Sequence, residues 1–207
     1  MRRLIYVPVI HSAQDMGSKA GALKQAYVQQ FGLDRWVRRR ALIGEIWEGI
    51  RVRILSLGLR WDRVRVYQDG LPVSGVEVRI AGELAAQGSR NYQLILELLA
   101  RGAQLEGTAD PALLREEHAL ISAIIDAADE VTRERTTAQY VKEGSRILRE
   151  RDAFISRRIQ ETLQEDEVGL LFMGMMHEVD RLLPAEIRVE YLIHRLPFRE
   201  IPAGLGL

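Results

Sequence analysis

The chain has 207 residues, of which 47% are hydrophobic and 28% charged, as in ordinary globular proteins. Its 29 basic side chains balance 29 acidic ones, so total charge gives no support for a nucleic-acid partner or an anionic membrane surface. Cysteine is absent, which excludes disulfide scaffolds, thiol nucleophiles and thiolate metal sites.

The beginning of the chain is a short apolar run that follows Met1-Arg2-Arg3 and is interrupted by Pro8. This run is too short for a signal peptide with a cleavage site, and nowhere does an apolar run approach the ~18 residues of a membrane span. We therefore expect a cytoplasmic protein without a membrane partner.

The first half of the chain alternates apolar runs with amphipathic stretches. Residues 4–10 predict a buried strand, a loop follows over 11–18, and helices are expected over 19–31 and 34–57. A second strand is predicted at 63–68, where polar and apolar residues alternate. It is expected to end at the turn signal Asp69-Gly70-Leu71-Pro72.

The middle of the chain is rich in predicted helices. Two helices are expected over 75–87 and 89–101, the second capped by Ser89, and a short strand at 103–106 follows them. Asp110-Pro111 has the pattern of an N-cap and a first-turn proline, and it opens a helix to about residue 129. A long, charged helix is expected over 136–165.

The last part of the chain predicts a buried strand at 168–174, a short helix before Pro184 and a strand at 187–193. These elements predict an α/β fold with a central mixed or mostly parallel sheet of about four or five strands, flanked by helices. We expect a single domain over 1–196, with a helix-rich middle at 75–165 and an irregular C-terminal tail at 197–207.

Two histidines occupy equivalent positions at opposite ends of the chain. His11 follows the apolar run 4–10, and His177 follows the apolar run 168–176. Each run has the length of a buried strand, and α/β sheets bind ligands in the crevice at the carboxyl ends of their strands. Because Asp69 follows the predicted second strand, we expect His11, Asp69 and His177 to share a site at that edge.

Two imidazoles and a carboxylate, without thiolates, suit a divalent transition metal such as Mn, Co or Zn. Asp15, Glu178 and Asp180 follow closely in the sequence as further acidic candidates. The competing interpretation is structural, because a histidine at a strand end commonly only makes hydrogen bonds and an aspartate before glycine commonly forms a turn.

The remaining chemistry-bearing residues are less suggestive. His118, within a predicted helix, and His194, near the tail, are expected to be structural or exposed. Ser12 and Ser74 lack the Gly-x-Ser-x-Gly pattern of a nucleophile elbow. The sequence contains neither a phosphate loop nor a dinucleotide-binding fingerprint.

The segment Gly174-Met175-Met176-His177 resembles the Gly-x-x-His motif of the TraB/TIKI and erythromycin-esterase/ChaN-like superfamily, which carries one such motif near each end. Pro8-Val9-Ile10-His11 resembles the first motif, with proline where glycine is expected. Arg151-Asp152 followed by Ile155 resembles the family's Arg-Asn/Asp-x-x-Met/Ile pattern, and Asp69 is the nearest match to its glutamate. The resemblance implies an α/β fold with a pocket, in a group that includes metal-dependent peptidases, esterases and haem-binding proteins.

The function that we expect is a metal-assisted hydrolase of peptide or ester bonds, acting on a small-molecule or peptide substrate. His11, Asp69 and His177 would be metal ligands or acid–base groups, since a bound metal can acidify a water for attack on a carbonyl group. Arg151 would hold an oxyanion or carboxylate with its planar guanidinium. Without a metal, an imidazole could itself be the general base.

Two alternatives stay open at this point. The first is a non-catalytic ligand- or haem-binding module of the same fold, with His11 or His177 as the axial ligand. The side chains near that haem would be Tyr6, Tyr67, Met173, Met175 or Met176. The second is an interaction protein that uses the 136–165 helix, whose mixed charges could pair with a partner helix in a homodimer.

Overall fold

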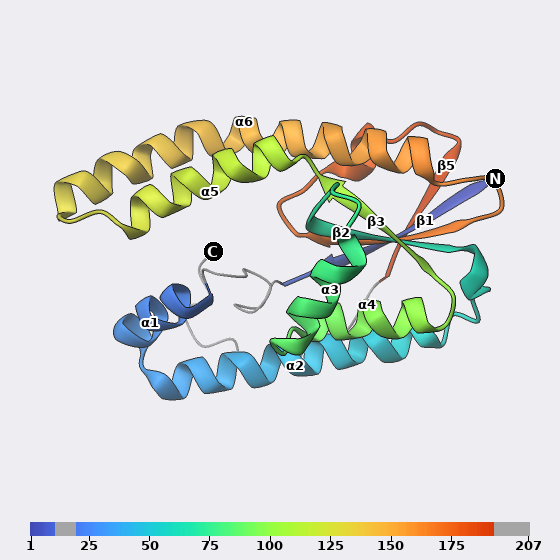
Figure 1. Ribbon diagram of the computed structural model, residues 1–207, viewed down its shortest axis with the longest axis horizontal. Helices are drawn as coiled ribbons and strands as arrows, with labels where there is room; N and C mark the ends of the chain where they lie inside the picture. The colour runs from blue at the N-terminus through green and yellow to red at the C-terminus, as the bar shows by residue number, and fades with distance from the viewer. Residues whose placement is uncertain (11–19, 193–207) are drawn as a thin grey trace.

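The computed structural model describes residues 1–10 and 20–192 and shows an α/β fold built on one five-stranded sheet (Figure 1). The strands are β1 (Arg2–Val9), β2 (Val64–Pro72), β3 (Gln104–Ala109), β4 (Val168–Gly174) and β5 (Ile187–Tyr191). Their order is β3-β2-β4-β1-β5, and every neighbouring pair is parallel. The predicted fold class is confirmed, and all five strands end at the same side of the sheet, which we call the carboxyl edge.

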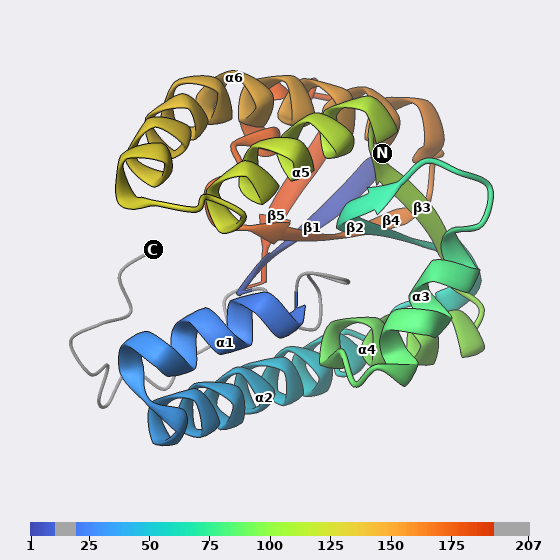
Figure 2. The ribbon, with the colours of Figure 1, turned by 60° about the vertical axis from the view of Figure 1, so that its left-hand side comes forward.

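Helices cover both faces of this sheet (Figures 1 and 2). One face is covered by α2 (Leu33–Leu55), α3 (Glu77–Ala86) and α4 (Arg90–Ala100), and α1 (Ala20–Phe31) lies beside α2. The other face is covered by α5 (Pro111–Ile125) and α6 (Glu130–Thr162). This arrangement explains the apolar character of the central strands, because a parallel sheet is buried on both sides.

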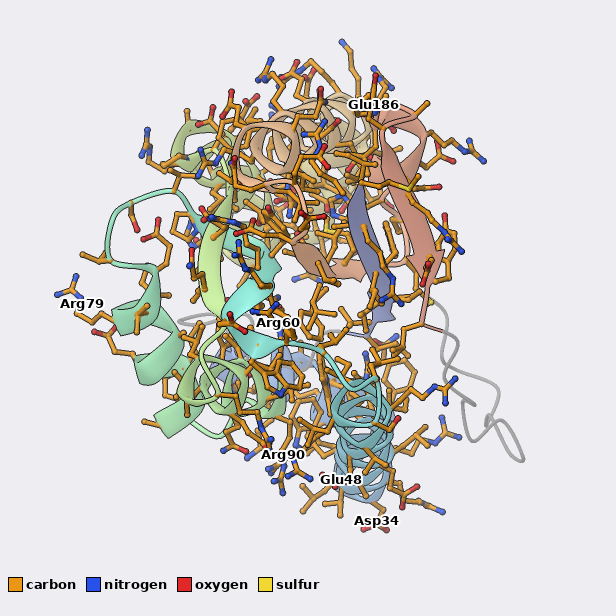
Figure 3. The ribbon with its side chains drawn as sticks, turned by 90° about the vertical axis from the view of Figure 1, so that its right-hand side faces the viewer. Asp34, Glu48, Arg60, Arg79, Arg90 and Glu186 are labelled. Atoms are coloured by element: carbon orange, nitrogen blue, oxygen red, sulfur yellow. The ribbon has the colours of Figure 1, made fainter. Side chains whose placement is uncertain are left out.

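The two faces of the sheet are filled by alternate residues of the same strands. In β1, Ile5, Val7 and Val9 pack in the core beneath α2 and α4. Leu4 and Tyr6 of the same strand pack on the other face, against Ile155 and other residues of α6. The view with side chains shows both spaces filled, while Asp34, Glu48 and Arg79 point outward (Figure 3).

The long helix α6 extends well beyond the sheet. The helix has 33 residues and is about 50 Å long at ~1.5 Å per residue, and the longest strand, β2, has only nine residues. Because α6 leads into the start of β4, its N-terminal half projects past the carboxyl edge, where it lies beside α5 (Figure 1). Arg146 of α6 pairs there with Glu116 of α5, so α5 already covers part of the helix that the interaction-protein alternative would use.

The sequence placed most elements correctly. The structure confirms Ser89 and Asp110 as N-caps, since their side chains accept hydrogen bonds from the N–H groups of Tyr92 and Ala112. It also confirms the bounds 168–174 of β4. The short helix before Pro184 is a 3-10 turn, Val179–Leu182. The predicted loop at 11–18 and the tail at 197–207 lie outside the described residues.

The prediction that β2 ends before Asp69 is wrong. The strand continues to Pro72, and the turn signal is instead an irregularity within it, where the pairing with β3 shifts between Gln68 and Pro72. Gly70 has φ +74°, a left-handed conformation that glycine adopts without a steric penalty. Asp69 therefore lies inside the strand, one residue beyond the last pair of β2 with β4.

Within the described part of the chain, no helix combines the length and the apolar character that crossing a membrane would require.

We predict that replacing Gly107 with alanine destabilises the fold by about 2 kcal/mol, because overpacking a tight site typically costs 1–3 kcal/mol. A Cβ at Gly107 of β3 would lie 2.8 Å from the backbone of Pro72 and Val73. Urea unfolding measures the change. The control is Gly44→Ala in α2, where an added Cβ meets no described atom within 4 Å apart from its chain neighbours and its own helix backbone, and a gain of up to about 1 kcal/mol is expected there. Equal stability of the two variants would contradict the prediction.

Candidate active site

A cluster of buried and half-buried ionisable side chains lies at the carboxyl edge, on the face covered by α5 and α6. Asp69 comes from β2, and His177 comes from the turn that follows β4. Arg151 and Asp152 come from α6, and Glu117 comes from α5. Two strands and two helices therefore contribute to one site, although their residues are far apart in the sequence.

His177 is held by its backbone as well as by its ring. Its N–H donates to the carbonyl of Gly174 at 3.2 Å, which closes the turn after β4. The hydroxyl of Tyr6 donates to the His177 carbonyl at 3.2 Å. Burial raises the pKa of the Tyr6 hydroxyl, so this group stays protonated as a donor. The imidazole itself is only 6% exposed.

The ring of His177 lies between two carboxylates. Its Nδ1 bonds Oδ1 of Asp152, whose Oδ2 accepts the N–H of Glu178 at 2.9 Å. On the other side, Nε2 faces Oδ2 of Asp69 at 3.4 Å. Burial by itself lowers the pKa of His177, but the bonds to Asp152 and Asp69 outweigh it and raise the pKa to about 9. At neutral pH the ring is therefore an imidazolium with a proton on each nitrogen.

Asp69 is the other centre of the cluster. Its Oδ1 accepts from Arg151 Nη2 at 2.6 Å, and its Oδ2 accepts from the N–H of Gly174 at 3.3 Å. Arg151 also donates from Nη1 to Glu117 Oε2 at 2.7 Å, and its side chain is 11% exposed. Two cations thus neutralise most of the charge of three carboxylates, as burial of these groups requires.

Local sequence explains why these side chains point into the cluster. Asp152 lies on the buried stripe of α6 that also carries Ile155, Ser156 and Ile159, so its carboxylate faces the sheet. The irregularity at Gly70 comes directly after Asp69, and β4 ends at Gly174, whose N–H Asp69 accepts. Bulges of this kind commonly re-aim side chains next to functional sites.

The structure brings together three of the four candidate residues: Asp69, Arg151 and His177. His11, the fourth, lies outside the described residues, as do Asp15 and His194. The other candidates are elsewhere: the side chain of Glu178 pairs with Arg181, Asp180 accepts from the Tyr191 hydroxyl, and His118 is exposed on α5.

Sequence reasoning missed Asp152 and Glu117 as members of the site. For Asp152 a signal was available, because a charged residue on an apolar helical stripe is rarely buried unless it is paired. For Glu117 no signal exists in its own helix, since α5 has no buried residue. Its role depends on the packing of α5 beside α6.

The donor atoms of this cluster fit a metal in part. His177 Nε2 and Asp69 Oδ2 are ligand types for a divalent ion and face each other, while Arg151 holds the second oxygen of Asp69. Among the described residues, no group of three such side chains could hold a metal ion. Of the tyrosines suggested for haem, Tyr67 instead bonds Thr162 at 2.8 Å.

No model of a known protein family, no curated protein and no solved structure matches this chain.

We predict that the free energy of unfolding falls by roughly 3 kcal/mol between pH 6 and pH 9.5, because one pKa unit corresponds to ~1.4 kcal/mol. The folded-state pKa of His177 is raised to about 9 from an ordinary value of 6.5. Its contribution is therefore complete below pH 6.5 and is lost as pH rises through 9. Urea unfolding at the two pH values measures the change. His177→Gln should remove most of this slope, and an unchanged slope in that variant would refute the assignment.

Proposed function

We propose that the protein is a hydrolase of peptide or ester bonds in which Asp69 and His177 carry the proton transfers. The observation that supports this most directly is the buried imidazole at the carboxyl edge, fixed at Nδ1 by Asp152 and facing Asp69 with Nε2 at 3.4 Å. A fixed acid next to a fixed carboxylate is the arrangement that general acid–base catalysis needs. The carboxyl edge is also where open α/β sheets bind ligands.

In this mechanism Asp69 is the base and His177 is the acid. A water attacks the substrate carbonyl carbon and gives its proton to Oδ2 of Asp69. The bond to the leaving oxygen or nitrogen then breaks as His177 Nε2 donates its proton to that atom. Because Asp69 Oδ2 and Nε2 face each other, the proton on Asp69 can return to His177, which restores both groups.

Arg151 and Asp152 act as positioning residues in this proposal. Arg151 holds Oδ1 of Asp69 at 2.6 Å, so that Oδ2 is turned to His177. Asp152 fixes the orientation of the imidazole and stabilises its protonated form. Since the two terminal nitrogens of Arg151 already bond Asp69 and Glu117, the guanidinium orients the base more readily than it clamps a substrate anion.

The metal-assisted hydrolase is the second candidate. It is favoured because Nε2 of His177 and Oδ2 of Asp69, both metal-ligand atoms, face each other. These two atoms, with His11 from the sequence, would hold the ion. When bound, a divalent ion would supply an acidified water as the nucleophile. Membership of the TraB/TIKI and erythromycin-esterase/ChaN-like superfamily is part of the same proposal.

We predict that the purified protein hydrolyses members of a panel of aryl esters and short peptides, and that His177→Gln and Asp69→Asn each lower kcat/KM by about a hundredfold or more. The rate should fall as pH rises through 9, because the acid form of His177 is then lost. The matched control is His118→Gln, a histidine exposed on α5, which should retain the parent rate. Parent activity in His177→Gln would refute the role of the imidazole.

We predict that extended dialysis against a chelator leaves this hydrolysis unchanged, because Asp69 and His177 supply both proton transfers. The measurement pairs the rate with elemental analysis of the parent and of a His11→Ala/His177→Ala variant. Loss of activity on chelation, recovery with Mn, Co or Zn, and stoichiometric metal that only the parent retains would establish the metal-assisted candidate instead.

A further inference from the structure

Three buried side chains on the α2–α4 face of the sheet have polar atoms without a hydrogen-bond partner in the described part of the chain. Gln68 of β2 and Asn91 of α4 are 0% exposed, and Trp47 of α2 is 2% exposed. The unpartnered atoms are Oε1 of Gln68, both Oδ1 and Nδ2 of Asn91, and Nε1 of Trp47. Such atoms lower stability unless a water or a ligand bonds them.

The three side chains lie on the same face of the sheet, and two of them are connected through Phe172. Gln68 is in register with Phe172 of β4, and the Phe172 ring centroid lies 6.1 Å from that of Trp47. Asn91 shares the inward stripe of α4 with Ile95 and Leu98, which belong to the same apolar core as Trp47. Because α4 leads into the start of β3, its first turn, which contains Asn91, lies toward the carboxyl edge.

The unpartnered atoms define the chemistry of the group that would bind them. Asn91 offers a donor and an acceptor from one amide, Gln68 adds an acceptor, and Trp47 adds a donor. A carboxamide pairs with an amide through two hydrogen bonds, one in each direction. Asn91 could make such a pair, whereas Gln68 would contribute only its acceptor Oε1, because its Nε2 already donates to the carbonyl of Asp69 at 3.0 Å.

The surroundings require that this group be uncharged. The buried charged residues of the described chain are Asp69, Asp152 and Glu167. Asp69 and Asp152 belong to the His177 cluster on the other face, and Glu167 bonds Arg65 at 2.5 Å. A carboxylate or ammonium group beside Asn91 would therefore have no counter-charge among the buried residues that the structure describes, which is strongly unfavourable.

We propose that Gln68, Asn91 and Trp47 form a subsite for a neutral carboxamide group of the substrate, on the face of the sheet opposite the His177 cluster. Gln68 and Asp69 are consecutive residues of β2, so the subsite and the proposed base are joined through one strand. In this proposal a substrate would lie across the carboxyl edge and contact both. The part of this inference that concerns the substrate rests on the proposed function, whereas carboxamide binding does not.

The test uses acetamide as the probe and the indole N–H of Trp47 as the reporter. In a nitrogen-15 labelled sample of the full chain, Trp47→Phe identifies this signal among those of the three tryptophans. We expect acetamide to shift it saturably in the parent and equally in His177→Gln, with acetate shifting it far less. Asn91→Leu should weaken acetamide binding by roughly tenfold or more, the loss expected when hydrogen bonds to a buried polar group are removed.

A stability measurement and a control variant complete the test. Asn91→Leu should unfold at a higher urea concentration than the parent, because the variant no longer buries an unpartnered amide. Arg90→Leu is the matched control: Arg90 precedes Asn91 but points away from the core (Figure 3), and this variant should bind acetamide as the parent does. Lower stability of Asn91→Leu without any acetamide shift in the parent would mean that the amide is structural and would overturn the subsite. A shift with glycerol but not with acetamide would also overturn it, in favour of a hydroxyl ligand.

If binding is present and hydrolysis is found, Asn91→Leu should raise KM for a carboxamide-bearing substrate while kcat is retained. Acetamide binding without hydrolysis in any assay would refute the proposed function and leave the subsite standing. Hydrolysis that depends on His177, without acetamide binding, would refute the subsite and leave the proposed function standing.

Discussion

The balance of buried charge around the His177 imidazole is the constraint on which the carboxyl edge depends. Asp152 and Asp69 hold the ring from both sides, and Asp69 is held in turn by Arg151, which bonds Glu117. A buried charge that loses its partner is strongly destabilising, so none of these groups is independent of the others. The cluster therefore ties β2 and the turn after β4 to α5 and α6, and the same interactions that hold these elements together turn the His177 imidazole and the Asp69 carboxylate toward each other.

Alternation along β2 gives the carboxyl edge two chemically different sides. Asp69 faces α6 and takes part in the charged cluster, while the preceding Gln68 faces α2 and α4 with a neutral amide. Successive side chains of a strand point to opposite faces of the sheet, so two consecutive polar residues place one polar group on each side. Apolar residues would be expected at both positions. The two proposed roles divide along the same line, with proton transfer assigned to the charged side and carboxamide recognition to the neutral side.

The elements that the sequence predicted well were those with strong local signals. The bounds of β4 follow from an uninterrupted apolar run, and Ser89 and Asp110 have side chains that cap a helix wherever the fold places it. The end of β2 was wrong because Asp69-Gly70 is a turn signal in isolation, and pairing with β3 resumes beyond it at Pro72. Likewise, α6 begins at Glu130, earlier than its apolar pattern indicated, because its first turns lie beside α5 rather than the sheet.

The amino-acid sequence by itself determined the class of fold, the strand after which His177 emerges and the candidacy of Asp69 and His177, since each depends on local patterns of apolar and polar residues. Arg151 was a candidate because its segment resembles a family motif. Only the tertiary structure decided which carboxylates the imidazole meets. Asp152 lies 25 residues before His177 and Asp69 lies 108 before it, and Glu117 reaches the cluster through Arg151. Such contacts, like the unpartnered amides of Gln68 and Asn91, are set by strand order and helix packing, which no short stretch of sequence encodes.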